Sequence, residues 1–353
     1  MKALVLSGGK GTRLRPITHT SAKQLVPIAN KPILFYGLEA IAEAGIKEVG
    51  IIVGETKKDI RDTVGDGSKW GLKVTYIEQE APLGLAHAVK ISESFIGSDD
   101  FVMYLGDNLI KDGIVSIVND FKKNKPNAQI LLADVPNPQQ FGVAVLKDGK
   151  VVLLEEKPKE PKSSLALVGV YMFDRNIFKA VNSIKPSARG ELEITDAIQY
   201  LVDNKFTVNP HIVQGWWKDT GKLEDMLEAN RIILETKKKE ILGYVDAESK
   251  IEGNVVIGKD ARIINSCIRG PAIIGEKTTI TDSYIGPFTS IYFNCSVSNS
   301  EIEHSIILEN SIINDIKRLE DSLIGQNVRI KKTEKKPAAY RIMVGDSSKV
   351  EII

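Results

Sequence analysis

Short apolar runs alternate with longer amphipathic segments along the first 240 residues. Each run is bounded by polar or glycine positions and has the length and composition of a buried β-strand. The runs lie at residues 3–6, 49–54, 73–79, 101–107 and 129–135. Amphipathic patterns that suit helices, such as residues 31–46, separate several of them. Because strands that alternate with helices form parallel sheets, the pattern predicts an α/β domain with a mainly parallel sheet.

The periodicity changes after about residue 240. Aliphatic residues then recur at steps of five or six positions, at Ile257, Ile263, Ile268, Ile274, Ile280, Ile285, Ile291, Val297, Ile302 and Ile307. A six-residue period is typical of a parallel β-helix, whose short strands point aliphatic side chains into one shared core. At about 18 residues per coil, residues 250–330 would form roughly four or five coils, and the stretch from Lys331 could cap the open end. The sequence therefore predicts two domains, residues 1–240 and 241–353.

A glycine-rich loop follows the first apolar run. Residues 6–16 read LSGGKGTRLRP, with three glycines within four positions and two arginines directly after them. Glycine lets a ligand approach the backbone, and N–H groups beside guanidinium groups suit a polyphosphate. The loop is not a Walker loop, since no G-K-[ST] ends it, and it lacks the third glycine of the dinucleotide fingerprint. With the basic segment 21–28 and the helix after it, the loop predicts a nucleotide-phosphate site at the carboxyl end of the first strand.

These segments resemble the sugar-1-phosphate nucleotidylyltransferase family, in particular its long members with a hexapeptide-repeat tail. Besides GGKGTRLRP and SAKQLVPI, the resemblance rests on YLGDN (104–108), FGVAVL (141–146), LEEKP (154–158), RGELEITD (189–196) and WWKDTG (216–221), which occur in the family's order. It implies a Rossmann-like nucleotidyltransferase domain followed by a left-handed parallel β-helix. Ser7 departs from the pattern, because the family usually has a small apolar residue there.

The resemblance implies transfer of a thymidylyl group from dTTP to α-D-glucose 1-phosphate, with Mg²⁺ as cofactor. Such a transfer needs carboxylates that hold the metal and basic groups on both sides of the reacting phosphorus. Asp107 and Asp219 match the metal ligands. Arg13 and Lys23 match basic residues that face the triphosphate, and Lys157 matches the one that binds the sugar phosphate. These five residues are the predicted catalytic set.

The same comparison implies a nucleotide site. Its predicted residues are Leu6, Gly8, Gly9, Gly11, Thr12, Arg13, Gln79, Gly84 and Asp107. The amide of Gln79 can pair with the edge of a pyrimidine, and Gly84 would let the backbone approach the base. The family commonly has an acidic residue where Leu83 stands. Thymine and uracil differ by one methyl group, worth only about 1 kcal/mol in an apolar pocket, so UTP stays open as a substrate.

A sugar-phosphate site is implied as well. Its predicted residues are Gly142, Glu156, Lys157, Gly169, Tyr171, Glu193 and Thr195. Glu156 matches a carboxylate that accepts hydrogen bonds from sugar hydroxyls, and Gly142 matches a close approach of backbone to the hexose. Glu193 and Thr195 also fit a helix N-terminus with a cap and first-turn acids, so a structural role stays open for both.

Charge and composition limit the other classes of function. The formal net charge of +1 gives no field that would favour nucleic acid or a membrane. No apolar stretch approaches the roughly 20 residues that span a bilayer, and the N-terminal MKALVLSGG does not resemble a signal peptide. The two cysteines, Cys267 and Cys295, make no disulfide framework. We therefore expect a cytoplasmic enzyme, and a homo-oligomer, because a β-helix exposes an end or a face that packs on a partner.

Two other functions stay open. One is a UTP-dependent uridylyltransferase that acts on glucose 1-phosphate or N-acetylglucosamine 1-phosphate. The other is a non-catalytic regulatory subunit, which would be expected to lose the loop or metal residues that this chain retains. His304, in the repeat region, could serve an acetyltransferase of similar shape as a base, but we expect a structural role for the repeats.

Overall fold

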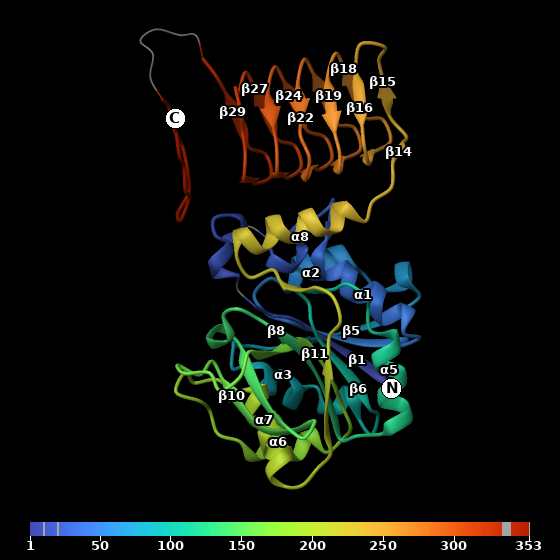
Figure 1. The fold of residues 1–353 in the computed structure, drawn as a ribbon, viewed down its shortest axis with the longest axis vertical. Coiled ribbons are helices and arrows are strands. Elements are labelled where there is room, and N and C mark those ends of the chain that lie inside the picture. The colour runs from blue at the N-terminus through green and yellow to red at the C-terminus, as the bar shows by residue number, and fades with distance from the viewer. Residues whose placement is uncertain (10, 20, 334–339, 353) are drawn as a thin grey trace. The chain divides into compact units, whose positions relative to one another are not determined.

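The computed structural model describes residues 1–353 except residues 10, 20, 334–339 and 353 (Figure 1). The chain forms two compact units, which are described separately. The first comprises Met1–Lys10, Ser21–Leu25 and Ile33–Asp219, and the second comprises Gly11–Thr20, Val26–Pro32 and Thr220–Ile353. Among the described residues, none of the helices is long and apolar enough to cross a bilayer.

The first unit is built on a mixed sheet with the order β10-β9-β11-β6-β1-β4-β5, to which β8 and β12 add beside β11. The strands are β1 (Lys2–Ser7), β4 (Glu48–Val53), β5 (Lys73–Glu78), β6 (Phe101–Leu105), β8 (Ala128–Asp134), β9 (Gly142–Lys147), β10 (Lys150–Glu156), β11 (Leu165–Phe173) and β12 (Val208–Ile212). Strands β6, β1, β4 and β5 are parallel, as the alternating pattern predicts. Strand β11 runs antiparallel to β6, β8 and β9.

Helices cover both faces of this sheet. They are α1 (Ile33–Glu43), α2 (Lys57–Val64), α3 (Leu85–Ile91), α4 (Glu93–Ile96), α5 (Val115–Asn124), α6 (Ile177–Ser183) and α7 (Ile194–Asp203). Side chains alternate between the two faces along a strand, and β1 shows the result. Leu4 and Leu6 join a core cluster with residues of α3, α6 and α7, whereas Ala3 and Val5 join a cluster with residues of α1, α2 and α5. The first unit is thus a Rossmann-like sandwich.

The second unit contains three stacked parallel sheets, in the orders β14-β17-β20-β23-β26-β28, β15-β18-β21-β24-β27-β29 and β16-β19-β22-β25 (Figure 1). Their strands are β14 (Glu240–Ile241), β15 (Tyr244–Val245), β16 (Lys250–Glu252), β17 (Val255–Ile257), β18 (Arg262–Ile264), β19 (Cys267–Arg269), β20 (Ala272–Ile274), β21 (Thr279–Thr281), β22 (Tyr284–Ile285), β23 (Thr289–Ile291), β24 (Ser296–Ser298), β25 (Glu301–Ile302), β26 (Ile306–Ile307), β27 (Ile312–Asn314), β28 (Leu323–Ile324) and β29 (Arg329–Lys331).

This arrangement confirms the repeat that the sequence predicts and is consistent with a left-handed β-helix. All ten of the periodic aliphatic residues are at most 1% exposed. Ile263 pairs with Ile280, which pairs with Val297, so one coil takes about 17 residues. The predicted cap begins at Lys331, which is the last residue of β29. Residues 332–333 and 340–352 contain no helix or strand, and residues 334–339 and 353 lie outside the described residues.

Polar side chains in the β-helix form ladders that repeat with the coils. The hydroxyl of Ser266 accepts a hydrogen bond from the N–H of Ser283 at 3.1 Å, and the hydroxyl of Ser283 accepts one from the N–H of Ser300 at 3.1 Å. A turn after the second sheet carries Asn265, Asp282, Asn299 and Asp315 in successive coils, all with positive φ. The amide of Asn265 donates to Asp282 at 2.6 Å, and that of Asn299 donates to Asp315 at 2.7 Å.

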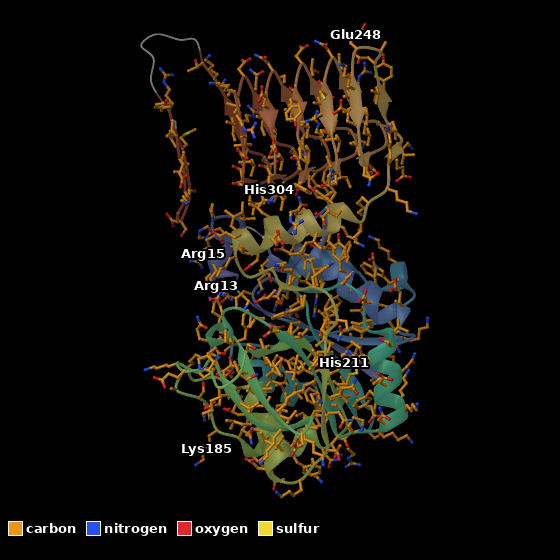
Figure 2. All side chains as sticks on the ribbon, in the orientation of Figure 1. Arg13, Arg15, Lys185, His211, Glu248 and His304 are labelled. Atoms are coloured by element: carbon orange, nitrogen blue, oxygen red, sulfur yellow. The ribbon has the colours of Figure 1, made fainter. Side chains whose placement is uncertain are left out.

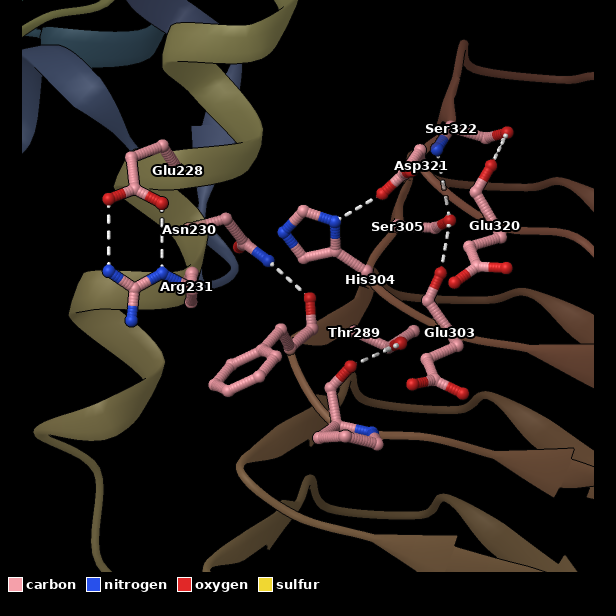
Figure 3. A network of polar contacts seen from close by, with 12 residues as sticks. Glu228, Asn230, Arg231, Thr289, Glu303, His304, Ser305, Glu320, Asp321 and Ser322 are labelled. Atoms are coloured by element: carbon pink, nitrogen blue, oxygen red, sulfur yellow. Dashed lines mark hydrogen bonds and ion pairs between the residues drawn. The ribbon is translucent and has the colours of Figure 1, made fainter.

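Helix α8 (Leu223–Glu235) and the short strands β2 (Pro27–Ile28) and β3 (Lys31–Pro32) belong to this second unit. Asn230 of α8 is fully buried, and its Oδ1 accepts hydrogen bonds from the N–H of Ala29 at 2.9 Å and the hydroxyl of Ser290 at 2.6 Å. Its Nδ2 donates to the carbonyl of Phe288 at 3.0 Å (Figure 3). Phe288 has a φ of 62°, which is unusual for a bulky residue. One amide thus joins α8 to the β-helix and to the segment between β2 and β3.

Candidate active site

Asp107 lies where β6 ends and the chain turns into β7 (Asn108–Ile110). Its carboxylate forms an ion pair with the Lys23 ammonium and accepts a hydrogen bond from the amide of Asn108 at 3.0 Å. Burial alone would raise the pKa of Asp107, but the charge of Lys23 and the hydrogen bonds from Lys23 and Asn108 hold this pKa below its ordinary value. The carboxylate is therefore ionised at neutral pH, as a metal ligand must be.

Asp219 reaches the same place through strand pairing. Strand β13 (Trp217–Asp219) runs antiparallel to β7, and Asp219 pairs with Asn108, the neighbour of Asp107. The two predicted metal ligands are more than 100 positions apart in the sequence, but Asp219 ends β13 opposite the residue that follows Asp107. Two carboxylates brought together in this way can share one cation.

Asn108 holds these strands together, and the sequence analysis missed it. Its side-chain oxygen accepts hydrogen bonds from Trp217 Nε1 at 2.6 Å and from the N–H of Gly169 at 3.2 Å, and Asn108 is almost fully buried. A Cβ at residue 169 would lie 2.6 Å from this oxygen, so Gly169 is required by the asparagine side chain. The sequence signal was a polar residue directly after the predicted metal ligand.

Gly8 and Gly9 follow β1 and lie near the side chains of other site residues. A Cβ at Gly9 would lie 3.5 Å from Cε of Lys23, and one at Gly8 would lie 3.5 Å from Oε1 of Gln79. Leu6, near the end of β1, is buried. Gly9 therefore lies beside a residue predicted to bind phosphate, and Gly8 lies beside the residue predicted to bind the base.

Gln24 is a second residue that the sequence analysis missed. It is 2% exposed, and among the described residues its Oε1 has no hydrogen-bond partner. Its Cγ lies 3.5 Å from the position of a Cβ on Gly106, next to Asp107, and its Nε2 lies 3.8 Å from that of a Cβ on Gly9. Leaving a buried acceptor unpaired costs about 1–3 kcal/mol, so such an atom points to a missing partner. A glutamine inside the apolar run after Lys23 was the available signal.

The remaining loop residues belong to the second unit. Gly11, with a φ of 62°, precedes the 3-10 turn η1 (Thr12–Leu14), and its carbonyl accepts a hydrogen bond from the hydroxyl of Thr18 at 2.6 Å. Thr12 and Arg13 are exposed, and Figure 2 labels Arg13. Their roles toward a nucleotide stay predictions.

The predicted base site contains a contact to His87. Gln79 follows β5, and its Nε2 lies 3.2 Å from the carbonyl of Gly84 and 3.0 Å from Nδ1 of His87 in α3. Burial, followed by the charge of Lys90, lowers the pKa of His87 below its ordinary value. Gly84 has a φ of +102°, and a Cβ there would lie 2.4 Å from the carbonyl oxygen of Leu192, so this glycine is required by protein backbone.

The predicted sugar residues gather around Glu156, at the end of β10. Its carboxylate accepts hydrogen bonds from the hydroxyl of Thr195 at 2.6 Å and from Arg189 at 3.2 Å, and the ammonium of Lys157 lies 3.7 Å away. Arg189, which the sequence analysis left unassigned, also pairs with Glu193 at 2.8 Å. Thr195 and Glu193 thus hold polar contacts at the start of α7, and their roles toward a sugar stay predictions.

Gly142 and Tyr171 complete this group. A Cβ at residue 142 would lie 2.8 Å from the hydroxyl oxygen of Thr195 and 3.1 Å from the carboxylate of Glu156. Gly142 therefore leaves room for the bond between those two side chains. Tyr171 is buried on β11, and burial, followed by the charge of Glu156, raises its pKa, so its phenol stays protonated.

Comparisons with known proteins show the family to which the chain belongs. The family model described as nucleotidyl transferase matches residues 2–236. The chain is 58% identical to the glucose-1-phosphate thymidylyltransferase of Streptomyces antibioticus over 100% of this chain and 99% of that protein. It is 46% identical to a low-salt glycan biosynthesis nucleotidyltransferase of Haloferax volcanii over the full length of both.

A solved structure shows the same likeness. The structure of a UDP-glucose pyrophosphorylase complexed with UDP-glucose is similar with a TM-score of 0.61 and 25% identity, over 67% of this chain and 99% of that one. Since the family model matches about two thirds of the chain and relatives align over its whole length, the chain belongs to the nucleotidyl transferase family.

Proposed function

We propose that this protein transfers a thymidylyl group from dTTP to α-D-glucose 1-phosphate and so forms dTDP-glucose and pyrophosphate. The observation that carries the proposal is the pairing of Asp219 with Asn108, the neighbour of Asp107. It occurs in a chain that is 58% identical over its length to a glucose-1-phosphate thymidylyltransferase. In this reaction a phosphate oxygen of the sugar phosphate forms a bond to the α-phosphorus of dTTP. The bond from that phosphorus to the bridging oxygen of pyrophosphate breaks.

Asp107 and Asp219 would hold Mg²⁺. The donor set fits this ion, because Mg²⁺ prefers a few carboxylates and completes its six positions with phosphate oxygens and water. Among the described residues there is no group of three or more His, Cys, Asp or Glu side chains that could hold a metal. When bound, the ion would neutralise charge on the reacting phosphate.

Basic side chains would manage the remaining charge. Lys23, which pairs with the Asp107 carboxylate, would bind the triphosphate as a point charge. Arg13 would stabilise the charge that builds on pyrophosphate, and Lys157 would bind the phosphate of the sugar. The amide oxygen of Gln24, which has no partner among the described residues, would accept a hydrogen bond from the bound nucleotide or from a water molecule beside it.

Glu156 would accept hydrogen bonds from sugar hydroxyls. Thr195 and Arg189 orient its carboxylate from two sides, so the acceptor is fixed before the sugar arrives. The protein would work in the cytoplasm and as a homo-oligomer that uses the β-helix for subunit contacts.

A second candidate is uridylyl transfer. It is favoured by the similarity to a UDP-glucose pyrophosphorylase and by the small difference between thymine and uracil. A pyrophosphate-release assay with Mg²⁺ would separate the two candidates, with dTTP or UTP crossed against glucose 1-phosphate or N-acetylglucosamine 1-phosphate. We expect the highest kcat/KM for dTTP with glucose 1-phosphate. A preference for UTP would replace the proposal with the second candidate, and no turnover with any pair would favour a regulatory subunit.

A further inference from the structure

Gln79 contacts two groups through a single atom. The residue is anchored at the end of β5, where its N–H donates to the carbonyl of Val53 at 2.9 Å. Its side-chain nitrogen, Nε2, lies 3.2 Å from the carbonyl oxygen of Gly84 and 3.0 Å from Nδ1 of His87. An amide nitrogen carries two hydrogens, so these two contacts use both of its donors.

The Gly84 carbonyl determines which way the amide faces. A carbonyl oxygen can only accept, so the amide must turn its nitrogen toward Gly84. This carbonyl belongs to a fixed piece of backbone, because the flanking Leu83 carbonyl and Ala86 N–H both bond to Leu192, at 2.8 and 3.0 Å. The second hydrogen of the amide then needs an acceptor, and Nδ1 of a neutral His87 ring, protonated on Nε2, provides it.

The environment of His87 supports the neutral ring. Burial lowers the pKa of His87, and the nearby charge of Lys90 lowers it further. At neutral pH the imidazole therefore accepts the hydrogen bond from Gln79.

The amide oxygen of Gln79 is left for a ligand. Among the described residues this oxygen accepts no hydrogen bond, and it lies 3.5 Å from the position that a Cβ on Gly8 would take. It is therefore beside the glycine loop, where the nucleotide is expected. Thymine and uracil carry an N–H at N3 and can donate to it, whereas cytosine has an unprotonated acceptor at N3.

We propose that His87 is a positioning residue that locks the Gln79 amide so that it presents only an acceptor to the base, and that this excludes cytosine nucleotides. The inference rests on the proposed function, since it concerns the base of the same nucleotide. It adds a residue, His87, to which the sequence analysis assigns no role. Without His87, only the Gly84 carbonyl still holds this orientation. The amide can then turn over by giving up that single bond, and it offers its N–H₂ group to N3 of cytosine.

Two variants at residue 87 test the proposal. His87→Asn keeps an acceptor close to the position of Nδ1, and His87→Leu has similar bulk but no acceptor. The measured quantity is the ratio of kcat/KM for dTTP to kcat/KM for dCTP with glucose 1-phosphate. This ratio does not depend on the fraction of folded enzyme, so partial unfolding of a variant does not obscure it.

We expect His87→Leu to lower the ratio about tenfold, the effect of one hydrogen bond, and His87→Asn to stay within about threefold of the unchanged protein. A ratio that does not change in His87→Leu would overturn the proposal. An equal fall in both variants would also overturn it, because the acceptor would then not matter.

The proposed function and this inference fail in different ways. If the unchanged protein turns over neither dTTP nor UTP, the proposed function is wrong. The dissociation constants of dTTP and dCTP for the same three proteins, measured by calorimetry, then test His87 alone, with the same expected tenfold change in their ratio.

Discussion

In the β-helix, a buried polar group finds its partner in the neighbouring coil, whereas around Asp107 the partners come from distant segments and some are missing. Ser283 bonds to Ser266 in one coil and to Ser300 in the next, and these bonds recur at the same spacing. In the first unit, the hydroxyl of Ser7 and the amide oxygen of Gln24 are buried with no partner among the described residues.

This difference separates stability from function. A repeated structure can satisfy each polar group with the equivalent group one coil away, so little free energy is lost. A site that must bind a charged ligand contains polar groups that have no hydrogen-bond partner within the protein and that remain available to the ligand. Substitutions should therefore act on folding in the β-helix and on catalysis around Asp107.

The largest expected effect is on catalysis. Asp107→Asn removes the charge that pairs with Lys23 and that would hold the metal, so we expect kcat/KM to fall about 1,000-fold. Pyrophosphate release with Mg²⁺ measures this. Asp112→Asn, at an exposed position after β7, is the control and should stay within about twofold. Comparable activity in both variants would contradict the metal assignment.

The next effect is on the β-helix core. Ile280 is fully buried between Ile263 and Val297, and Ile280→Ala leaves a cavity that should cost about 3 kcal/mol. Thermal unfolding followed by calorimetry should show a lower Tm for the transition of this unit. Thr281→Ala, at the neighbouring half-buried position, should change the stability by less than about 0.5 kcal/mol. Equal losses would mean that the inward row of aliphatic residues is not the core.

A smaller effect is expected at helix α8. Asn230→Ala would leave the N–H of Ala29 and the carbonyl of Phe288 without their partner, at a cost of about 2 kcal/mol. The free energy of unfolding in urea should fall by this amount. Asn124→Ala, at an exposed position in α5, serves as the control. If the two variants were equally stable, the buried amide would not hold α8 against the β-helix.

The smallest effect compares two buried serines. Ser283→Ala removes the acceptor of the Ser300 N–H and should cost about 1 kcal/mol, whereas Ser7→Ala removes a hydroxyl with no partner among the described residues and should cost nothing or raise the Tm. Both substitutions delete the same oxygen from a serine that is under 10% exposed. A larger loss at Ser7 would show that its hydroxyl has a role in the fold.

The same two regions differ in how far the sequence predicts them. The six-residue period identified ten buried side chains of the β-helix, because each coil meets its neighbour at a constant spacing. The antiparallel direction of β11 was not predictable, since an apolar run such as residues 165–173 looks the same in either direction. Motifs indicate Asp107 and Glu156, and they contain or border Asn108, Gln24 and Arg189. Local patterns do not show which distant groups these residues contact, such as Trp217 and Gly169 for Asn108 or Glu156 for Arg189.

Two glycines show what a motif alone does not reveal. Gly84 and Gly142 were interpreted as places where a ligand approaches the backbone. In the structure, a Cβ at either residue would meet protein atoms, those of Leu192 at the first and those of Thr195 and Glu156 at the second. A glycine in a motif indicates that another group comes close to the backbone there. Only the structure shows whether that group belongs to the protein or to a ligand.

At the turn after the second sheet, the side chains of successive coils alternate between amide and carboxylate. The residues are Asn265, Asp282, Asn299 and Asp315. Amide and carboxylate alternate from coil to coil, so every carboxylate stands next to a donor and no two negative charges are stacked. Removing one coil at this turn would bring two like side chains together, whereas removing two coils would restore the alternation. At this turn, the β-helix can therefore gain or lose coils without stacking like side chains only if two coils are added or removed together.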